Sequence, residues 1–377
     1  MRKSVSKNRA EGVVSVPTSK SVAHRMLILA ALCNGQRTLI HGITPSEDVL
    51  ATIDCLSALG VKIEYSGDEA TVYGIDISKA KPTLPLNCRE SGSTLRFLIP
   101  LATLGNQRVE FVGSERLLER PLDVYEKLGF VFERQANSLV VSAELTSGEY
   151  HIPGDVSSQF ITGLLFALST LPDDSRIIID GKIESKPYID LTLDVMKTPR
   201  WESENSILIP GGKAMCESDL TVEGDWSAAA FLLALNCLGG NVQVLGLNND
   251  SRQGDKVCSE YFKQLSEGYS EINIENTPDL GPILFAVAAA KHGGKFIGTR
   301  RLKIKESDRA YAMKCELEKL GAELIIEENS VTVPKRRLHA PTEALYGHND
   351  HRIVMSLAVL CSLFGGEIDG CEAAAKS

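Results

Sequence analysis

The sequence contains no apolar run long enough to span a membrane, and its first residues, MRKSVSKNRAEG, lack the apolar segment of a secretory signal. It also lacks an excess of positive charge, because 49 acidic residues outnumber 40 basic ones and the formal net charge is -9. This balance argues against nucleic acid or an anionic membrane as the main partner. Any anionic ligand must therefore be bound by a local cluster of basic residues.

The nine cysteines stand singly, in odd number and without a CxxC pair. This pattern favours reduced thiols over a disulfide framework, so we expect a cytoplasmic protein. A metal site is not expected either. His348 and His351 lie close together, but no third cluster of ligands accompanies them.

The length and composition are those of a globular protein. A chain of 377 residues, with 43% hydrophobic and 24% charged residues, is long enough for two or three domains with cores of their own.

One phrase occurs six times along the chain: a polar start, an apolar run of helical length, a glycine or turn, and a short strand that ends near glycine. The first helix of each unit is apolar on nearly all sides, as in SAAAFLLALNCL and ILFAVAAA, which indicates a buried rather than a half-exposed helix. Between several copies lies a second phrase, an amphipathic helix that ends in Leu-Gly and precedes two alternating strands. The six copies begin with TSKSVAHR, ESGSTLR, SSQF, GDWSAAAF, TPDLGP and NDHR.

These phrases predict six units, divided three and three between two lobes, with helices inside and sheets outside. An ordinary doubly wound α/β sheet does not fit, because the strands are not continuous buried runs. Two units are irregular. No Leu-Gly follows Met196, and no strand pair follows Tyr261, so either the third and fourth units are shortened or residues are missing at these two points of the sequence.

The polar starts hold most of the residues that could bind an anion. In TSKSVAHR, Lys20 stands at the helix entrance, and Arg25 follows Ser21 by one turn on the same face. A helix N-terminus adds free N–H groups and about half a positive charge, which favours phosphate or carboxylate. From these residues alone, Ser21 as a simple helix cap and Lys20 as a solvated charge explain the pattern equally well.

Two further starts repeat this design. In ESGSTLR, Gly92 lets a ligand approach the backbone closely. SSQF offers three neutral donors, Ser157, Ser158 and Gln159, where capping would need one. In KIKESDR a carboxylate lies among cations within one turn, which suits proton transfer near an anionic substrate, although a solvated charged turn explains it too.

Eight ordered segments, KSVAHR, ESGSTLR, ERP, SSQ, SKPYIDLT, TPDL, KESDR and NDHR, resemble the 5-enolpyruvylshikimate-3-phosphate synthase family from near residue 14 to the end. The resemblance implies a two-lobed inside-out α/β barrel of six βαβαββ units. It also implies crossovers near Val14 and Glu223. Residues 15–222 would form one lobe, residues 1–14 and 223–377 the other, with the active site in the cleft between them.

The resemblance implies a 3-phosphoshikimate 1-carboxyvinyltransferase of the shikimate pathway. Such an enzyme transfers the enolpyruvyl group of phosphoenolpyruvate to the 5-hydroxyl of shikimate 3-phosphate and releases phosphate. The expected partners are these two substrates. We expect no cofactor, and we expect the protein to be a monomer. Glyphosate competes with phosphoenolpyruvate in this family.

The family's site residues carry over by motif. Asp279 would be the base for the 5-hydroxyl and Glu306 the acid that protonates the substrate methylene, with Lys20 assisting. Cations beside Glu306 oppose this role, because they lower the pKa of a carboxyl group. Shikimate 3-phosphate would be bound by Lys20, Ser21, Arg25, Ser157, Ser158, Gln159, Ser185, Tyr188, Asp279 and Lys305, and phosphoenolpyruvate by Lys20, Gly92, Arg120, Gln159, Arg309, Arg352 and Lys376.

Two alternatives stand beside this interpretation. One is a UDP-N-acetylglucosamine enolpyruvyl transferase, which has the same fold but uses a reactive loop cysteine. No cysteine here lies in such a loop, and SKPYIDLT and KESDR fit the shikimate enzyme better. The other is a non-catalytic anion-binding module of the same fold, which the net negative charge and the presence of Asp279 and Glu306 disfavour.

Overall fold

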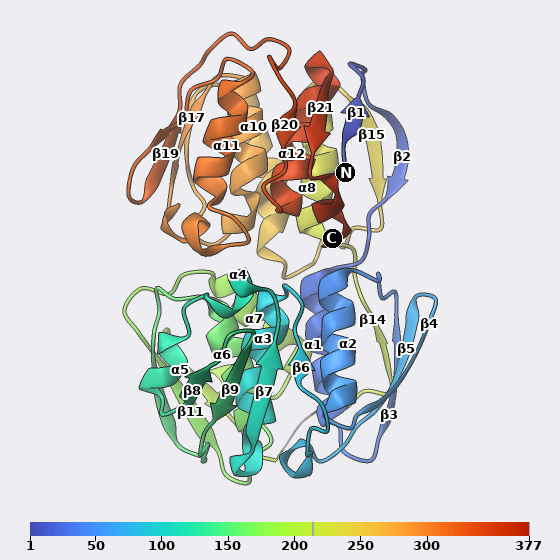
Figure 1. Cartoon of the computed structure of the whole chain (residues 1–377), viewed down its shortest axis with the longest axis vertical. Helices are drawn as coiled ribbons and strands as arrows, with labels where there is room; N and C mark the ends of the chain where they lie inside the picture. The colour runs from blue at the N-terminus through green and yellow to red at the C-terminus, as the bar shows by residue number, and fades with distance from the viewer. Residues whose placement is uncertain (213–214, 377) are drawn as a thin grey trace. The chain divides into compact units, whose positions relative to one another are not determined.

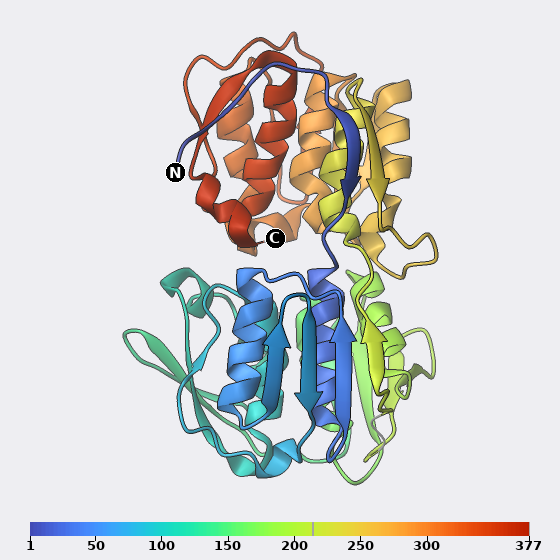
Figure 2. The ribbon, with the colours of Figure 1, turned by 90° about the vertical axis from the view of Figure 1, so that its right-hand side faces the viewer.

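The computed structural model describes residues 1–212 and 215–376, the side chain of Lys376 excepted. It forms two compact units, shown in Figures 1 and 2. The N-terminal unit is Thr18–Glu223, and the C-terminal unit is Met1–Pro17 together with the chain from Gly224 onward. Among the described residues, no helix is long and apolar enough to cross a membrane.

The N-terminal unit has three four-stranded sheets, one for each repeat. In each sheet two parallel strands are followed by an antiparallel hairpin, which gives the spatial order first, second, fourth, third. The first sheet takes its first strand from the far end of the unit, where β14 (Asp219–Thr221) pairs with β3 (Arg37–His41). The other strands are β4 (Lys62–Ser66), β5 (Glu69–Tyr73), β6 (Leu86–Asn87), β7 (Arg108–Val112), β8 (Val131–Arg134), β9 (Ser138–Ser142), β10 (Glu149–Pro153), β11 (Ser175–Asp180), β12 (Arg200–Trp201) and β13 (Ser206–Ile209).

The first helix of each repeat is buried along nearly its whole length, as its apolar sequence predicts. These helices are α1 (Lys20–Leu32), α3 (Gly92–Ala102) and α6 (Ser158–Leu168). Figure 2 shows β3, β4, β5 and β14 lying over α1 and α2, so this sheet covers the helices from outside. The remaining helices are α2 (Glu47–Ala58), α4 (Glu115–Leu118), α5 (Asp123–Lys127) and α7 (Lys186–Met196).

The C-terminal unit follows the same plan with fewer strands. Its three sheets have the orders β15-β2, β16-β17-β19-β18 and β1-β21-β20. The strands are β1 (Lys3–Val5), β2 (Glu11–Ser15), β15 (Asn241–Leu245), β16 (Ser270–Asn273), β17 (Gly294–Ile297), β18 (Ile325–Ile326), β19 (Ser330–Val333), β20 (Leu345–Tyr346) and β21 (Gly366–Asp369). The helices are α8 (Trp226–Cys237), α9 (Cys258–Glu267), α10 (Gly281–Ala290), α11 (Arg309–Glu318) and α12 (His351–Phe364), with 3-10 turns η3 (Gly254–Val257), η4 (Pro278–Leu280), η5 (Arg300–Ile304) and η6 (Cys371–Lys376).

The six predicted repeats are confirmed as six sheets, and the glycines that follow the Leu-Gly helices, Gly60, Gly129 and Gly321, have φ values of 94°, 89° and 85°. None of the described sheets closes on itself, so "barrel" describes only the arrangement of helices and sheets.

Of the two alternatives for the third repeat, shortening does not apply, because β12 and β13 complete its sheet although no Leu-Gly precedes them. The fourth repeat is short, with two strands. The apolar residues Leu232, Leu233 and Leu235 of α8 are half-buried, which corrects the prediction that this helix is buried rather than half-exposed.

The expectation that all cysteines are thiols is also wrong, because Cys33 and Cys216 form a disulfide within the N-terminal unit. Cys33 ends α1, and Cys216 precedes β14. The pairing of β14 with β3 brings these segments together, and Thr38 Oγ1 donates to the carbonyl of Glu217 at 2.9 Å. The other seven cysteines are thiols. A separation of 183 residues left no local sequence signal for the bond.

Candidate active site

Most of the predicted ligands of the N-terminal unit lie at or near helix N-termini, where main-chain N–H groups point outward. Ser19, not Ser21, is the N-cap residue of α1, so Ser21 lies in the first turn and is not the cap. Ser157 caps α6 by accepting from Gln159 N. Ser185 precedes α7 with φ of 56° and makes no side-chain cap bond. The hydroxyls of Ser21, Ser158 and Ser185 are therefore not needed as helix caps.

Lys20 is held by a carboxylate of the neighbouring helix. Its Nζ lies 2.8 Å from Asp48 Oδ2 on α2, and both side chains are mostly buried. Lys20 is thus not a freely solvated charge. Sequence reasoning missed Asp48, which stands 28 residues later and belongs to no motif of the family comparison.

Arg25 is a buried cation whose bonds go to neutral groups. Its Nε donates to Thr192 Oγ1 at 2.8 Å, Nη1 to the carbonyl of Ser21 at 2.7 Å and Nη2 to the carbonyl of Tyr188 at 3.2 Å. Burial lowers the pKa of Arg25 to about 10, so it remains charged at neutral pH. Arg25 therefore joins two predicted ligand segments, the start of α1 and the start of α7.

Gly92 and Arg120 lie in direct contact. A Cβ atom on Gly92 would lie 2.5 Å from Arg120 Nη1, so this glycine leaves room for the guanidinium. Arg120 Nε is buried and has no hydrogen-bond partner among the described residues. A buried donor of this kind calls for an acceptor, which a bound anion could supply.

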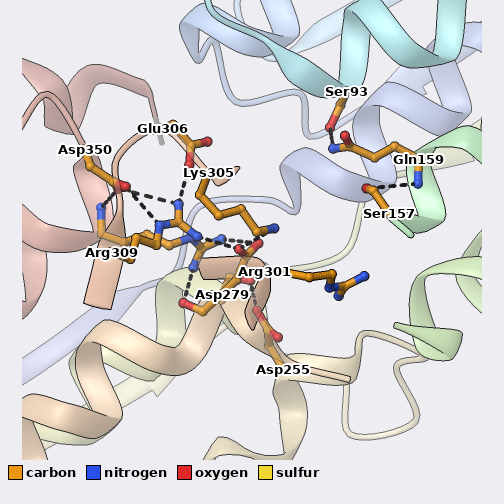
Figure 3. Close-up of polar contacts among 12 residues, drawn as sticks. Ser93, Ser157, Gln159, Asp255, Asp279, Arg301, Lys305, Glu306, Arg309 and Asp350 are labelled. Carbon is orange, nitrogen blue, oxygen red and sulfur yellow. Dashed lines mark hydrogen bonds and ion pairs between the residues drawn. The ribbon is translucent and has the colours of Figure 1, made fainter. Parts of the chain in front are cut away.

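Gln159 is oriented by two side chains of α3, of which Figure 3 shows Ser93. Arg96 Nη1 donates to Gln159 Oε1 at 2.8 Å, and Gln159 Nε2 donates to Ser93 Oγ at 2.9 Å. The guanidinium of Arg96 also lies over the ring of Phe160. Arg96 and Ser93 stand in the ESGSTLR motif, so their positions could have suggested this role.

In the C-terminal unit, Arg309 is the centre of a buried ion-pair network (Figure 3). Its Nη1 donates to Asp279 Oδ1 and its Nη2 to Glu306 Oε2, each at 2.6 Å. Its Nε donates to Asp350 Oδ2 at 2.9 Å. The sequence analysis predicted Arg309, Asp279 and Glu306 as site residues, but it missed Asp350. Asp350 is also the N-cap of α12 and accepts from Arg352 N at 2.9 Å.

Two more cations contact Asp279. Lys305 Nζ lies 3.2 Å from Oδ1, and Arg352 Nη2 lies 3.1 Å from Oδ2. Burial alone would raise the pKa of Asp279, but the charges of Arg352, Lys305 and Arg309 together hold it well below its usual range. Asp279 is therefore ionised at neutral pH, and burial lowers the pKa of Lys305.

The predicted residues thus make contacts in small groups: Arg25 with Ser21 and Tyr188, Gly92 with Arg120, and Asp279 with Lys305, Arg309 and Arg352. The side chain of Lys376 lies outside the described residues. Within the described chain, no group of three or more His, Cys, Asp and Glu side chains is arranged to hold a metal ion.

The family model for EPSP synthase (3-phosphoshikimate 1-carboxyvinyltransferase) matches residues 5–377. The chain belongs to this family. It is 38% identical to the 3-phosphoshikimate 1-carboxyvinyltransferase of Clostridium kluyveri over 99% of this chain and 94% of that protein. It is 39% identical to that of Clostridium novyi, over 92% of this chain and 88% of that protein. Members of this family transfer a carboxyvinyl (enolpyruvyl) group to shikimate 3-phosphate, so the predicted family, enzyme class and reaction are confirmed over both alternatives.

Solved structures show the same fold. An EPSP synthase from Acinetobacter baumannii superposes with a TM-score of 0.76 at 21% identity, covering 100% of this chain and 95% of its own. The enolpyruvyl transferase NikO from Streptomyces tendae gives 0.74 at 15% identity, with coverage of 100% and 94%. The predicted fold class is confirmed.

Proposed function

We propose that two clusters of residues carry out the family's reaction, the transfer of the enolpyruvyl group of phosphoenolpyruvate to the 5-hydroxyl of shikimate 3-phosphate with release of phosphate. The N-terminal cluster is Lys20, Ser21, Arg25, Gly92, Arg120, Ser157, Ser158, Gln159, Ser185 and Tyr188, and the C-terminal cluster is Asp279, Lys305, Glu306, Arg309 and Arg352. The observation that carries the assignment of residues is Arg120. Its buried Nε has no partner among the described residues, and its Nη1 fills the space beside Gly92 at the N-terminus of α3. A guanidinium next to free helix N–H groups suits a carboxylate or phosphate.

Shikimate 3-phosphate would bind to the N-terminal unit. Ser157 and Ser158 at the start of α6 would hold its phosphate, because hydroxyls and helix N–H groups both donate. Gln159, fixed by Arg96 and Ser93, would present its amide to the same substrate. Ser21, Arg25, Ser185 and Tyr188 would complete this side, with Lys305 and Asp279 from the C-terminal unit.

Phosphoenolpyruvate carries a carboxylate and a phosphate, which need several cations. Arg120 and Lys20 of one unit, and Arg309, Arg352 and Lys376 of the other, would supply them. The same charges would stabilise the tetrahedral intermediate, which bears both anionic groups. Catalysis therefore requires that one pair of substrates contacts residues of both units.

Asp279 would accept the proton of the 5-hydroxyl. It is ionised, as a base must be, but three cations make it a weak base in the free enzyme. When substrate anions bind Arg309, Arg352 and Lys305, they offset these positive charges, so the basicity of Asp279 rises at the time it is needed. Glu306 would protonate the substrate methylene. Its bond to Arg309 favours the ionised carboxylate, so substrate binding must weaken that bond before Glu306 can donate.

The test is phosphate release by the purified full-length chain. We expect release only when shikimate 3-phosphate and phosphoenolpyruvate are both present, and the same rate after treatment with EDTA, because no metal is implied. Omission of each substrate is the control. No release with both substrates, or equal release from phosphoenolpyruvate alone, would contradict the proposed reaction.

A further inference from the structure

Asp255 is a buried carboxyl group in the C-terminal unit that has no role in the function proposed above. It lies in η3, and the residue is 1% exposed. The hydroxyl of Ser227, in the first turn of α8, donates a hydrogen bond to Asp255 Oδ2. In Figure 3 its side chain points toward the cluster around Asp279.

The backbone around Asp255 is tied to the start of α8. Gln253 Nε2 donates to the carbonyl of Gly224 at 2.8 Å, and Gln253 Oε1 accepts from Trp226 N at 3.1 Å. Gln253 is itself buried. These bonds hold the start of η3 against the start of α8, beside the Ser227 hydroxyl that donates to Asp255.

Several charged and titratable groups face Asp255. Among the charged groups, Asp279 on η4 and Arg352 on α12 have the largest electrostatic effect on the pKa of Asp255, followed by Asp225 at the N-cap of α8. The charge of Asp255 in turn acts on two titratable groups of α9, Cys258 and Tyr261. Burial and the negative charge of Asp279 raise the pKa of Asp255 to about 6. Arg352 and the Ser227 hydroxyl act in the opposite direction, because both favour the carboxylate.

We propose that Asp255 is a positioning residue for enolpyruvyl transfer, which attracts Arg352 and keeps Asp279 basic enough to accept the 5-hydroxyl proton. The reason is the charge around Asp279. Three cations favour its ionised form, and a second negative charge nearby partly cancels them. The two carboxyl groups titrate as a pair, with the more buried one holding the proton longer. This inference rests on the proposed role of Asp279.

The experiment compares the pH dependence of kcat/KM for phosphoenolpyruvate in the full-length enzyme and two variants. Asp255→Asn removes the negative charge, so the pKa of Asp279 falls and the acid limb moves to lower pH, with kcat at neutral pH about 10-fold lower. Ser227→Ala removes a hydrogen bond that favours the carboxylate, so the pair keeps its proton longer and the acid limb moves to higher pH.

Asp250→Asn is the matched control, because Asp250 is an exposed carboxyl five residues earlier and its loss changes the net charge equally. We expect no movement of its acid limb. A purely structural role of Asp255 would lower activity or stability in both test variants without moving the limb, and that result would overturn the inference. If Asp255→Asn does not fold, the upward movement in Ser227→Ala alone decides. A wild-type enzyme without phosphate release would contradict the proposed function instead.

Discussion

The proposed ligand residues of the two units come from the same kind of repeat, but their charges are balanced differently. In the N-terminal unit, Arg25 bonds to a hydroxyl and two carbonyls, and Arg120 Nε has no partner within the described chain. In the C-terminal unit, Arg309 bonds to three carboxylates. A cation with neutral partners keeps its full positive charge for a bound anion. A cation that is already paired with carboxylates attracts a further anion less strongly.

Under the proposed function, the residues of the two units would have separate tasks. Arg25 and Arg120 of the N-terminal unit are suited to recognition, because phosphate or carboxylate can bind there without displacing an internal anion, whereas Lys20 is already paired with Asp48. The C-terminal cluster would serve proton transfer, because its carboxylates would change basicity when substrate anions offset the charges of their cations. Substitutions in the two clusters should therefore have different kinds of effect.

The largest effect is expected for Arg309→Ala. It leaves Asp279, Glu306 and the fully buried Asp350 without their shared cation, which should destabilise the protein by about 3–5 kcal/mol and abolish turnover. Arg120→Ala should instead leave stability nearly unchanged and raise KM for phosphoenolpyruvate. Urea unfolding measures the stability of each variant, and steady-state kinetics measure its turnover and KM. Equal stability losses in the two variants would remove the distinction between the clusters, and Arg309→Lys replaces Arg309→Ala if the latter does not fold.

The next effect concerns catalysis alone. Asp279→Asn and Glu306→Gln should each lower kcat by about 100-fold or more while shikimate 3-phosphate binding, measured by calorimetry, stays nearly intact. Ser158→Ala, in the N-terminal cluster, should show the reverse pattern of weaker binding with little change in kcat. Turnover close to that of the wild type in either carboxyl variant would exclude its role as acid or base.

The sequence predicted the parts of this comparison that depend on local structure. Helix starts such as those at Lys20, Gly92 and Ser158 follow from short patterns of capping residues, glycines and apolar runs. The family motifs supplied the named ligands of both clusters.

Partners that are distant along the chain had no local signal. Asp48 reaches Lys20 only because α2 packs beside α1, and β1 joins β21 only in the folded C-terminal unit. The Cys33–Cys216 bond depends in the same way on the pairing of β14 with β3. Tertiary packing, rather than any short pattern, decides these pairings.

Mild acid should affect the two units in opposite directions. Burial lowers the pKa of His24, in the N-terminal unit, to about 3, so the unfolded chain binds the proton first and stability is lost as pH falls below about 6.5, at about 1.4 kcal/mol per pH unit. Asp255, in the C-terminal unit, has a raised pKa of about 6, so the folded state binds the proton first and stability increases as pH falls below that value.

Hydrogen exchange of buried amides at pH 6.5 and 5.0, corrected for intrinsic rates, measures this contrast. Protection should fall in α1 and rise in α10. In His24→Gln, which does not titrate, the fall in α1 should disappear, although the variant is less stable overall. A parallel fall in both helices, unchanged by the substitution, would contradict the assignment to His24.

The smallest effect is expected for a substitution that reduces the space between Gly92 and Arg120, where phosphoenolpyruvate is proposed to bind. Gly92→Ala places a Cβ 2.5 Å from Arg120 Nη1, but the guanidinium is the end of a flexible side chain and can shift. We therefore expect KM for phosphoenolpyruvate to rise about 5-fold, equivalent to about 1 kcal/mol, with kcat less affected. Gly148→Ala is the matched control, because its Cβ would meet no atom within 4 Å and we expect no change in KM.

If Gly92 acts through Arg120, the effect of Gly92→Ala on KM must be smaller in an Arg120→Ala background, because the guanidinium that the methyl group displaces is already absent. Full additivity of the two substitutions would mean that the methyl group obstructs the substrate directly, and the coupling of Gly92 to Arg120 would be withdrawn.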